Sequence, residues 1–244
     1  MIDEEKIRKL KDLIDSSKNI VVISGAGIST PSGIPDIRGV NGAANNINLI
    51  KKYGYDYETI VSHTFFMTNT EQFYRYYKEQ MIFKDAKPNA AHLWLASLEK
   101  NHNVTIITQN IDGLHIEAGS SHVIEFHGSV QRNHCLKCGT SYGLNAIFEA
   151  KGVPHCKCGG IIKPDVVLFE EGIDQHAIID SLQALKNADL LLVIGSSLKV
   201  YPAAGLIDYY NGNKSVLINK DPTLLDHYFS LVINDNIVDI INKL

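Results

Sequence analysis

Short apolar segments that alternate with amphipathic helices constrain the fold of this chain most strongly. Residues 19–24 (NIVVIS) are rich in β-branched side chains and run directly into a glycine turn, a pattern typical of a buried parallel strand. Similar segments recur at 104–108, 165–169, 190–194, 215–219 and 229–233. Helical spacing separates several of them, most clearly at 89–100 and 174–187. The alternation predicts an α/β fold with a Rossmann-like, doubly wound parallel sheet.

Two stretches do not fit this alternation. Residues 39–84 open with a loop rich in Gly, Asn and Ala and continue into aromatic segments, and residues 131–163 hold all four cysteines. A length of 244 residues accommodates one large domain that carries a smaller one. We therefore assign residues 1–38, 85–130 and 164–244 to the sheet domain, and residues 39–84 and 131–163 to a small inserted domain.

Charge and hydropathy exclude two classes of partner. The 23 Lys and Arg residues are outnumbered by 27 Asp and Glu residues, giving a formal net charge of -4, so no general basic field attracts a phosphate backbone. The first residues lack a basic and apolar leader, and the longest apolar runs, such as 190–194, fall far short of the roughly 20 residues that cross a bilayer. We expect a cytoplasmic protein with no direct nucleic-acid or membrane partner.

The glycine turn after the first strand is a candidate phosphate site. Gly25, Ala26 and Gly27 leave room for backbone N–H groups to approach a pyrophosphate. The dinucleotide fingerprint GxGxxG is incomplete, because its third glycine is Thr30. The alternative interpretation is a glycine turn that serves close packing alone.

A second candidate site follows the strand at 104–108. Gln109, Asn110 and Asp112 stand at its carboxyl end, where ligands of open α/β sheets collect. An ordinary polar turn capped by Asn and Asp is the alternative.

Several motifs in the same order resemble the sirtuin family of NAD-dependent protein deacylases. They are GAGISTPSGIPDIR (25–38), TQNIDGLH (108–115), EFHGS (125–129), the cysteines, PDVVLF (164–169) and GSSL (195–198). The similarity extends from about residue 20 to Asn219. It implies an NAD-binding Rossmann-like domain, a small domain with a helical segment and a zinc module, and an acyl-lysine protein or peptide as substrate.

The resemblance also implies which residues bind NAD. Asp112 and the backbone of Ile111 would hold the nicotinamide carboxamide, while Asn110 and Gln109 would serve the ribose. The remaining cofactor-binding residues lie in the glycine turn, the loop after it, the GSS turn and the last matched strand: Gly25, Ala26, Gly27, Ser29, Thr30, Ile37, Arg38, Gly195, Ser196, Ser197 and Asn219.

His127 matches the general base of the family, and Asn110 completes the catalytic set. An imidazole with a pKa near 6.5 suits removal of a proton from a ribose hydroxyl at neutral pH. Val167 and Phe169 are the expected substrate contacts. In the implied reaction NAD is consumed, nicotinamide leaves, and the acyl group passes from lysine to ADP-ribose.

The four cysteines predict a structural zinc ion. Cys135 and Cys138 form a C-x-x-C pair, which brings two thiolates to one tetrahedral metal. The second half is irregular, because the family's usual CxxCGG is here His155-Cys156-Lys157-Cys158-Gly-Gly. Either Cys156 joins Cys158 or His155 takes its place; we favour the four cysteines because thiolate is the stronger ligand. A metal-free cluster of packed thiols is the remaining alternative.

Three positions bear on how the family pattern works in this chain. Ile37 replaces a Phe of GIPDFR, and Glu170 replaces the Gly of FGE. Tyr77 stands where relatives that remove acidic acyl groups carry Arg, so neutral acyl groups are favoured. The competing functions are a protein mono-ADP-ribosyltransferase, a weakly catalytic NAD-binding sensor and, outside this chemistry, a dehydrogenase.

Overall fold

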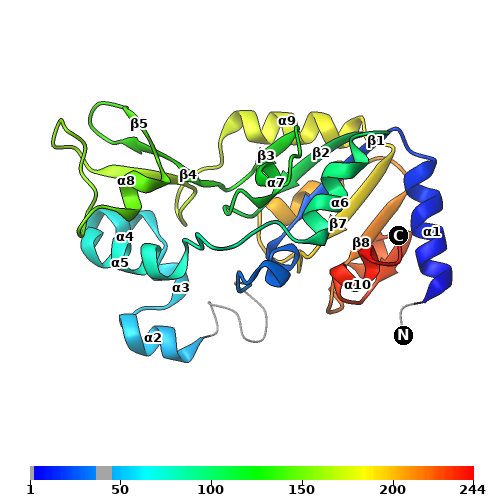
Figure 1. The fold of residues 1–244 in the computed structure, drawn as a ribbon, viewed down its shortest axis with the longest axis horizontal. Helices are drawn as coiled ribbons and strands as arrows, with labels where there is room; N and C mark the ends of the chain where they lie inside the picture. Colours follow the sequence, from blue (N-terminus) through cyan, green and yellow to red (C-terminus); the bar gives the residue numbers. More distant parts are fainter. Residues whose placement is uncertain (1–2, 37–45) are drawn as a thin grey trace.

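A computed structural model describes residues 3–36 and 46–244 of the chain. Two lobes lie side by side along the long axis (Figure 1). The large lobe contains a parallel sheet with its covering helices. The small lobe contains a three-stranded sheet and a group of short helices. We use these two names below.

The sheet of the large lobe has the order β3-β2-β1-β7-β8-β9, and every neighbouring pair is parallel. Its strands are β1 (Asn19–Ser24), β2 (Asn103–Thr108), β3 (Val123–Glu125), β7 (Leu190–Ile194), β8 (Ser215–Ile218) and β9 (Leu231–Ile233). The order reverses at β1, so the ends of β1, β2 and β7 meet at the switch point where such sheets bind ligands. The predicted fold class is confirmed.

Helices cover both faces of this sheet. One face carries α1 (Glu4–Asp15), α6 (Ala90–Leu98) and α10 (Ile237–Ile241); the other carries α9 (Gln175–Lys186) and the 3₁₀ helix η4 (Ala203–Tyr209). Alternate residues of β1 enter the two cores: Ile20 and Val22 pack with α1, whereas Val21 and Ile23 pack on the opposite side. This period of two is what a strand covered on both faces requires.

The small lobe is built from short elements. Its antiparallel sheet has the order β5-β4-β6. The elements are α2 (Ile47–Tyr53), α3 (Tyr57–Ile60), α4 (His63–Thr68), α5 (Thr70–Gln80), β4 (Gly128–Cys135), β5 (Ser141–Gly143), α8 (Leu144–Phe148) and β6 (Ile162–Val166). Aromatic side chains dominate its core, where Phe66, Phe73, Tyr74 and Tyr77 are fully buried. The remaining elements are α7 (Leu114–Glu117) and the 3₁₀ helices η1 (Ala26–Ile28), η2 (Thr30–Ser32) and η5 (Asp226–Tyr228).

One predicted strand belongs to the other sheet. The apolar segment 165–169 was expected among the parallel strands, but the strand there, β6, ends at Val166 and pairs antiparallel with β4. Hydrophobic pattern alone does not distinguish between the two sheets, because a short apolar segment can be buried in either of them. The predicted domain boundaries after residues 130 and 163 consequently fall inside β4 and β6.

Of the helices formed by residues 3–36 and 46–244, none combines the length and apolar character that crossing a bilayer requires.

Candidate active site

The turns after β1 and β7 touch each other at the switch point. Gly25 N–H donates to the Ile194 carbonyl at 3.0 Å, and Gly27 N–H donates to the Gly195 carbonyl at 2.8 Å. A Cβ on Gly25 would lie 2.8 Å from the Gly195 oxygen, and one on Gly27 would lie 2.8 Å from the Gly195 Cα. Close packing of two backbones is therefore one reason for these glycines. Ala26, which begins η1, is half-buried between them.

Three predicted residues from two different turns form one polar cluster. Asn110 Nδ2 donates to Ser29 Oγ at 3.0 Å and to the Gly25 carbonyl at 3.2 Å. Ser29 Oγ in turn donates to Asp112 Oδ2 at 2.7 Å. The other Asp112 oxygen accepts the N–H of Leu114 at 2.9 Å, where α7 begins. The structure thus brings Ser29, Asn110 and Asp112 together beside the glycine turn.

The environment of Asp112 opposes its ionisation. Burial raises the pKa of the Asp112 carboxyl above its usual value, whereas the Leu114 N–H and the Ser29 hydroxyl lower it. A carboxyl group in this position is suited to an amide ligand.

Gln109 and Ser196 connect the ends of β2 and β7. Gln109 Nε2 donates to Ser196 Oγ at 3.2 Å, and the same oxygen accepts the N–H of Leu198. An amide side chain, Gln109, and a hydroxyl side chain, Ser196, therefore lie next to the polar cluster. Such groups recognise ribose hydroxyls.

His127 is held at the junction of the two lobes. Its Nδ1 lies 3.1 Å from the Gln109 carbonyl. Because a carbonyl oxygen only accepts, Nδ1 carries the proton, and Nε2 of the neutral ring keeps a free lone pair. Burial lowers the pKa of His127, and the bond to Gln109 acts in the opposite direction. The free Nε2 is chemically able to remove a proton at neutral pH.

The predicted substrate segment is attached to His127 and to the small lobe. Val167 N–H donates to the His127 carbonyl at 3.0 Å. Phe169 N–H donates to the Val61 carbonyl at 3.1 Å, and the Phe169 carbonyl accepts the N–H of His63 at 2.9 Å. Phe169 also meets the ring of Tyr57 edge-on, with centroids 6.0 Å apart.

Glu170 has a backbone conformation that favours glycine. Its φ is +75°, in the left-handed region where a Cβ is unfavourable. Its carboxylate accepts the N–H of Thr64 at 2.8 Å, in the first turn of α4. The Gly-to-Glu difference from the family pattern thus adds a side chain that caps a helix.

Glu171, Lys163 and His63, to which the sequence assigned no role, fix the same segment. Glu171 accepts from the Lys163 Nζ at 3.0 Å, from the Leu168 N–H at 2.9 Å and contacts His63 Nδ1 at 2.9 Å. Lys163 is itself buried and also donates to the Pro164 carbonyl at 3.1 Å. The sequence signal for this tether is weak: a lysine next to the PDVVLF motif.

Within the described residues, the remaining predicted cofactor residues do not join the hydrogen bonds of this cluster. Thr30 is exposed and donates to the Gly27 carbonyl at 3.0 Å, and Asn219 Nδ2 donates to the Asp221 carbonyl at 2.7 Å. Ile111 packs against the core of the small lobe, and Ser197 is half-buried after Gly195. Ile37 and Arg38 lie outside the described residues.

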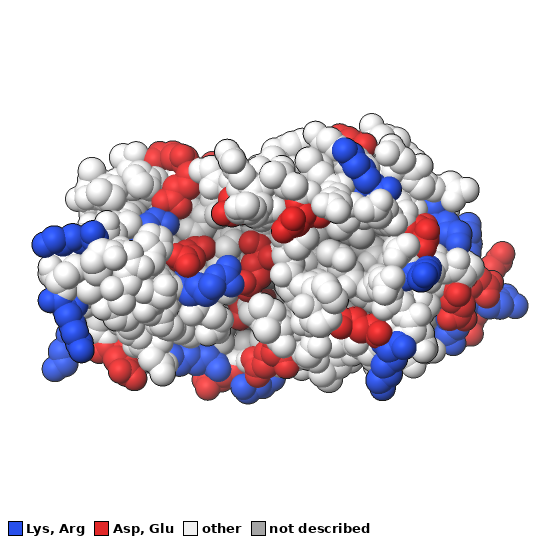
Figure 2. Space-filling model, turned by 90° about the horizontal axis from the view of Figure 1, so that it is seen from above, with Lys and Arg blue, Asp and Glu red and all other residues white. Residues whose placement is uncertain are grey.

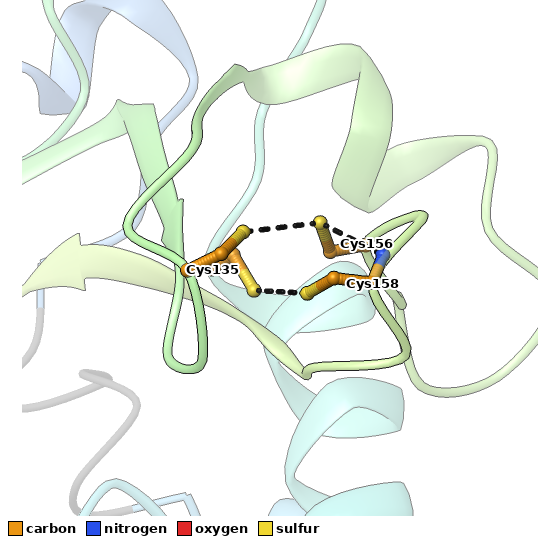
Figure 3. A group of neighbouring side chains, drawn as sticks. Cys135, Cys156 and Cys158 are labelled. Carbon is orange, nitrogen blue, oxygen red and sulfur yellow. Dashed lines mark hydrogen bonds between the residues drawn. The ribbon is translucent and has the colours of Figure 1, made fainter.

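The four cysteines form one cluster in the small lobe (Figure 3). All four sulfur atoms lie within 4.8 Å of one another, with Cys135 and Cys158 at 3.5 Å and Cys138 and Cys156 at 3.6 Å. Tetrahedral zinc with Zn–S bonds of about 2.3 Å places sulfurs about 3.8 Å apart, so the donor set fits this metal. Figure 3 shows Cys156 and Cys158 turned toward the turn that holds Cys135. His155 is not among the cluster's ligand atoms in the described part of the chain.

Together, the switch-point cluster, the histidine at the lobe junction and the four-sulfur site define a nucleotide-binding α/β protein with a metal-binding insert. A family model described as the Sir2 family matches residues 25–202. The chain belongs to the Sir2 family, and the resemblance to sirtuins is confirmed.

Relatives and solved structures agree with this assignment. The chain is 51% identical over 236 residues to an NAD-dependent protein deacetylase of Clostridium acetobutylicum, covering 96% of this chain and 95% of that protein. A Sir2 structure with a deacetylated p53 peptide and 3'-O-acetyl ADP-ribose aligns with a TM-score of 0.86, 39% identity and coverage of 97% and 96%. A Sir2 structure with p53 peptide and NAD+ aligns with a TM-score of 0.83, 38% identity and the same coverage.

Proposed function

We propose that this chain is an NAD-dependent protein-lysine deacetylase, which releases nicotinamide and transfers the acyl group to ADP-ribose. Membership of the Sir2 family and near full-length similarity to a protein of that activity support it. The observation within the molecule that carries the proposal is His127. Its side chain faces the switch-point turns through Gln109, while its carbonyl holds the expected substrate segment through Val167.

We infer that the switch-point residues hold NAD. Asp112 and the backbone of Ile111 would bind the carboxamide, because a buried carboxyl and a backbone group complement an amide. Asn110, Gln109 and Ser196 would bind the nicotinamide ribose. The other predicted residues would surround the phosphates and the adenosine: Gly25, Ala26, Gly27, Ser29, Thr30, Ile37, Arg38, Gly195, Ser197 and Asn219. When bound, NAD would supply the ribose carbon to which the acyl oxygen bonds. It would also supply the leaving group, nicotinamide.

His127 acts as the general base of this reaction. Its Nε2 lone pair removes a proton from a ribose hydroxyl, and the Gln109 carbonyl keeps the ring in the required tautomer. Because burial lowers the pKa of His127, the base form persists below pH 6.5. Activity should therefore fall only as the pH drops below the usual histidine range.

Val167 and Phe169 would align the acyl-lysine substrate. Their backbone is held in extended conformation by Val61, His63 and His127, so a peptide strand meets a prepared edge. Tyr77 is buried in the aromatic core where acid-specific relatives carry Arg, which favours neutral acyl groups.

We further propose that Cys135, Cys138, Cys156 and Cys158 hold one structural zinc ion. Four thiolates fill a tetrahedral site, which leaves no position for a reacting water. Cysteines grouped for a metal also favour a reducing compartment, and we propose the cytoplasm.

The division into an NAD-binding sheet domain and an inserted small domain, with the predicted boundaries, is likewise a proposal. Its support is that the small lobe has an aromatic core of its own, distinct from the two cores of the sheet.

One incubation tests the function. The protein is mixed with NAD and an acetylated peptide, and nicotinamide, NADH and peptide mass are followed together. Equal amounts of nicotinamide and deacetylated peptide, without NADH, are expected. His127→Ala should lower kcat by about 10²- to 10⁴-fold, whereas the exposed His176→Ala should not. A peptide that gains ADP-ribose and keeps its acetyl group would overturn the proposal in favour of the transferase.

A further inference from the structure

Two buried histidines lie beneath the switch-point turns and take no part in the proposed reaction. His92, on α6, is fully buried, and His115, on α7, is 2% exposed. Their ring centroids are 4.9 Å apart and the rings meet at 61°. Two imidazoles face each other in an apolar interior, where polar groups need partners.

A chain of hydrogen bonds leads from this pair to Asn110. His115 Nε2 lies 2.8 Å from Ser24 Oγ, and Ser24 Oγ lies 2.9 Å from Thr108 Oγ1. Thr108 Oγ1 then accepts the backbone N–H of Asn110 at 3.1 Å. Ser24 and Thr108 are register partners at the ends of β1 and β2, so the chain crosses directly under the site.

Both rings are neutral at physiological pH. Burial lowers the pKa of His92 to about 4 and that of His115 to about 3, and the neighbouring His92 ring contributes to the lowering at His115. Each ring therefore carries one proton, and its position can be assigned by counting donors and acceptors.

The partners decide which nitrogen carries that proton. His92 Nδ1 faces the N–H of Asn89 at 3.3 Å and must accept, so the proton of His92 is on Nε2. His92 Nε2 and His115 Nδ1 have no hydrogen-bond partner within the described residues. If His115 also carries its proton on Nε2, these two atoms are one donor and one acceptor. The opposite tautomer would leave two buried donors without a partner in neighbouring rings, which is costly.

We propose that His92 and His115 are positioning residues for Asn110. They fix a one-way chain in which His115 donates to Ser24, Ser24 donates to Thr108, and Thr108 accepts from the Asn110 backbone. The proposal rests on the proposed function, since it concerns the residue expected to serve the nicotinamide ribose.

The position of the Asn110 backbone controls its side chain. Asn110 Nδ2 reaches the Gly25 carbonyl at 3.2 Å and Ser29 Oγ at 3.0 Å. A shift of the backbone would lengthen both bonds and turn the amide away from the glycine turn. The chain therefore adjusts binding and reaction of NAD without contacting it.

Nitrogen NMR of the native enzyme tests the tautomers directly. With 15N-labelled histidine, both rings should show a protonated Nε2 and an unprotonated Nδ1 between pH 6 and 8. A protonated Nδ1 on His115 would overturn the proposal. This measurement needs no substrate, so it stands even if the chain does not deacetylate peptides.

Two conservative variants test the effect on catalysis. Thr108→Val and Ser24→Ala each interrupt the chain, and each should lower kcat/KM for NAD by roughly two- to tenfold, with KM for the acetylated peptide unchanged. Ser181→Ala is the matched control, because its buried hydroxyl in α9 has no partner among the described residues. Unchanged kcat/KM in the first two variants would show that the chain has only a structural role.

A double-mutant cycle identifies Asn110 as the target. Calorimetry should show that Ser24→Ala weakens NAD binding in the native background and has no further effect in an Asn110→Ala background. Additive effects would mean that Ser24 acts elsewhere, and would overturn the proposal.

Discussion

The large and small lobes reach stability by different means. The large lobe buries aliphatic strands on both faces of one sheet, with helices on each side. The small lobe has a sheet of only three strands, an aromatic core and a four-sulfur cluster. Small cores bury too little surface to offset the entropy of folding. The comparison indicates that burial stabilises the large lobe, and we infer that the small lobe needs the proposed zinc ion in addition.

Removing zinc should produce the largest difference between the two lobes, because the small lobe should lose its structure and the large lobe should keep it. Structural zinc contributes about 10–16 kcal/mol to the folding of small domains. A strong chelator, or Cys135→Ser, should abolish the near-ultraviolet dichroism of the buried tyrosines Tyr74 and Tyr77. Fluorescence of Trp94, the single tryptophan, should persist because Trp94 lies on α6 and packs against the core of the large lobe. His155→Ala should retain one zinc per chain; loss of zinc in that variant would contradict the four-cysteine site.

Core truncations should weaken zinc binding only when they lie in the small lobe. Leu192→Ala, in the centre of the sheet, should cost about 2–5 kcal/mol of unfolding free energy and leave zinc affinity unchanged. Phe73→Ala should cost about 3–5 kcal/mol and weaken zinc binding, because Phe73 shares its core with Cys135 and Cys156. Zinc competition with a chromogenic chelator measures the difference. Equal zinc affinities in the two variants would show that metal and core are independent.

Acid should weaken the large lobe through its buried histidines. The pKa values of His92 and His115 are about 4 and about 3 in the folded protein, and near 6.5 when unfolded. The unfolded chain therefore binds more protons between these limits, and stability falls as pH decreases from 6.5 toward 4. Each group contributes about 1 kcal/mol per pH unit. Urea unfolding followed by Trp94 fluorescence at pH 7, 6 and 5 measures this slope, which His92→Gln should roughly halve.

Changes at Glu170 should have the smallest effect. Glu170→Gly removes backbone strain and also removes the cap on α4, so the melting temperature should change by less than about 2 °C. Glu170→Ala keeps the strain and loses the cap, and should melt a few degrees lower. If both variants melt alike, the left-handed backbone at this position is not strained.

Local patterns predicted the sheet well because each strand is covered on both faces. The apolar strand at 190–194 and the Asn89 cap of α6 appear as expected. β3 was missed, since three half-buried residues give no periodic signal. The segment 165–169 was assigned to the wrong sheet, because pairing with β4 depends on the path of the chain through the cysteine module.

The site was predictable as residues but not as a network. Motifs predicted roles for Asn110, Asp112 and His127, which stay predictions; the structure links Asn110 to Asp112 through Ser29 and holds His127 through the Gln109 carbonyl. The chain from His115 to Thr108 passes through Ser24, which is 91 residues from His115 and 84 from Thr108. No local spacing encodes such contacts.

The position of His127 also has a mechanical consequence. Its ring is anchored to the turn of the large lobe, and its main chain to the strand edge that leaves the small lobe. Figure 2 shows acidic side chains gathered around a hollow near the middle of the molecule. A rotation of one lobe against the other would stretch or break one of these two attachments and move the ring of His127. Damage to the distant sulfur cluster should therefore displace His127 while the hydrogen bonds that join Ser29, Asn110 and Asp112 in the large lobe persist.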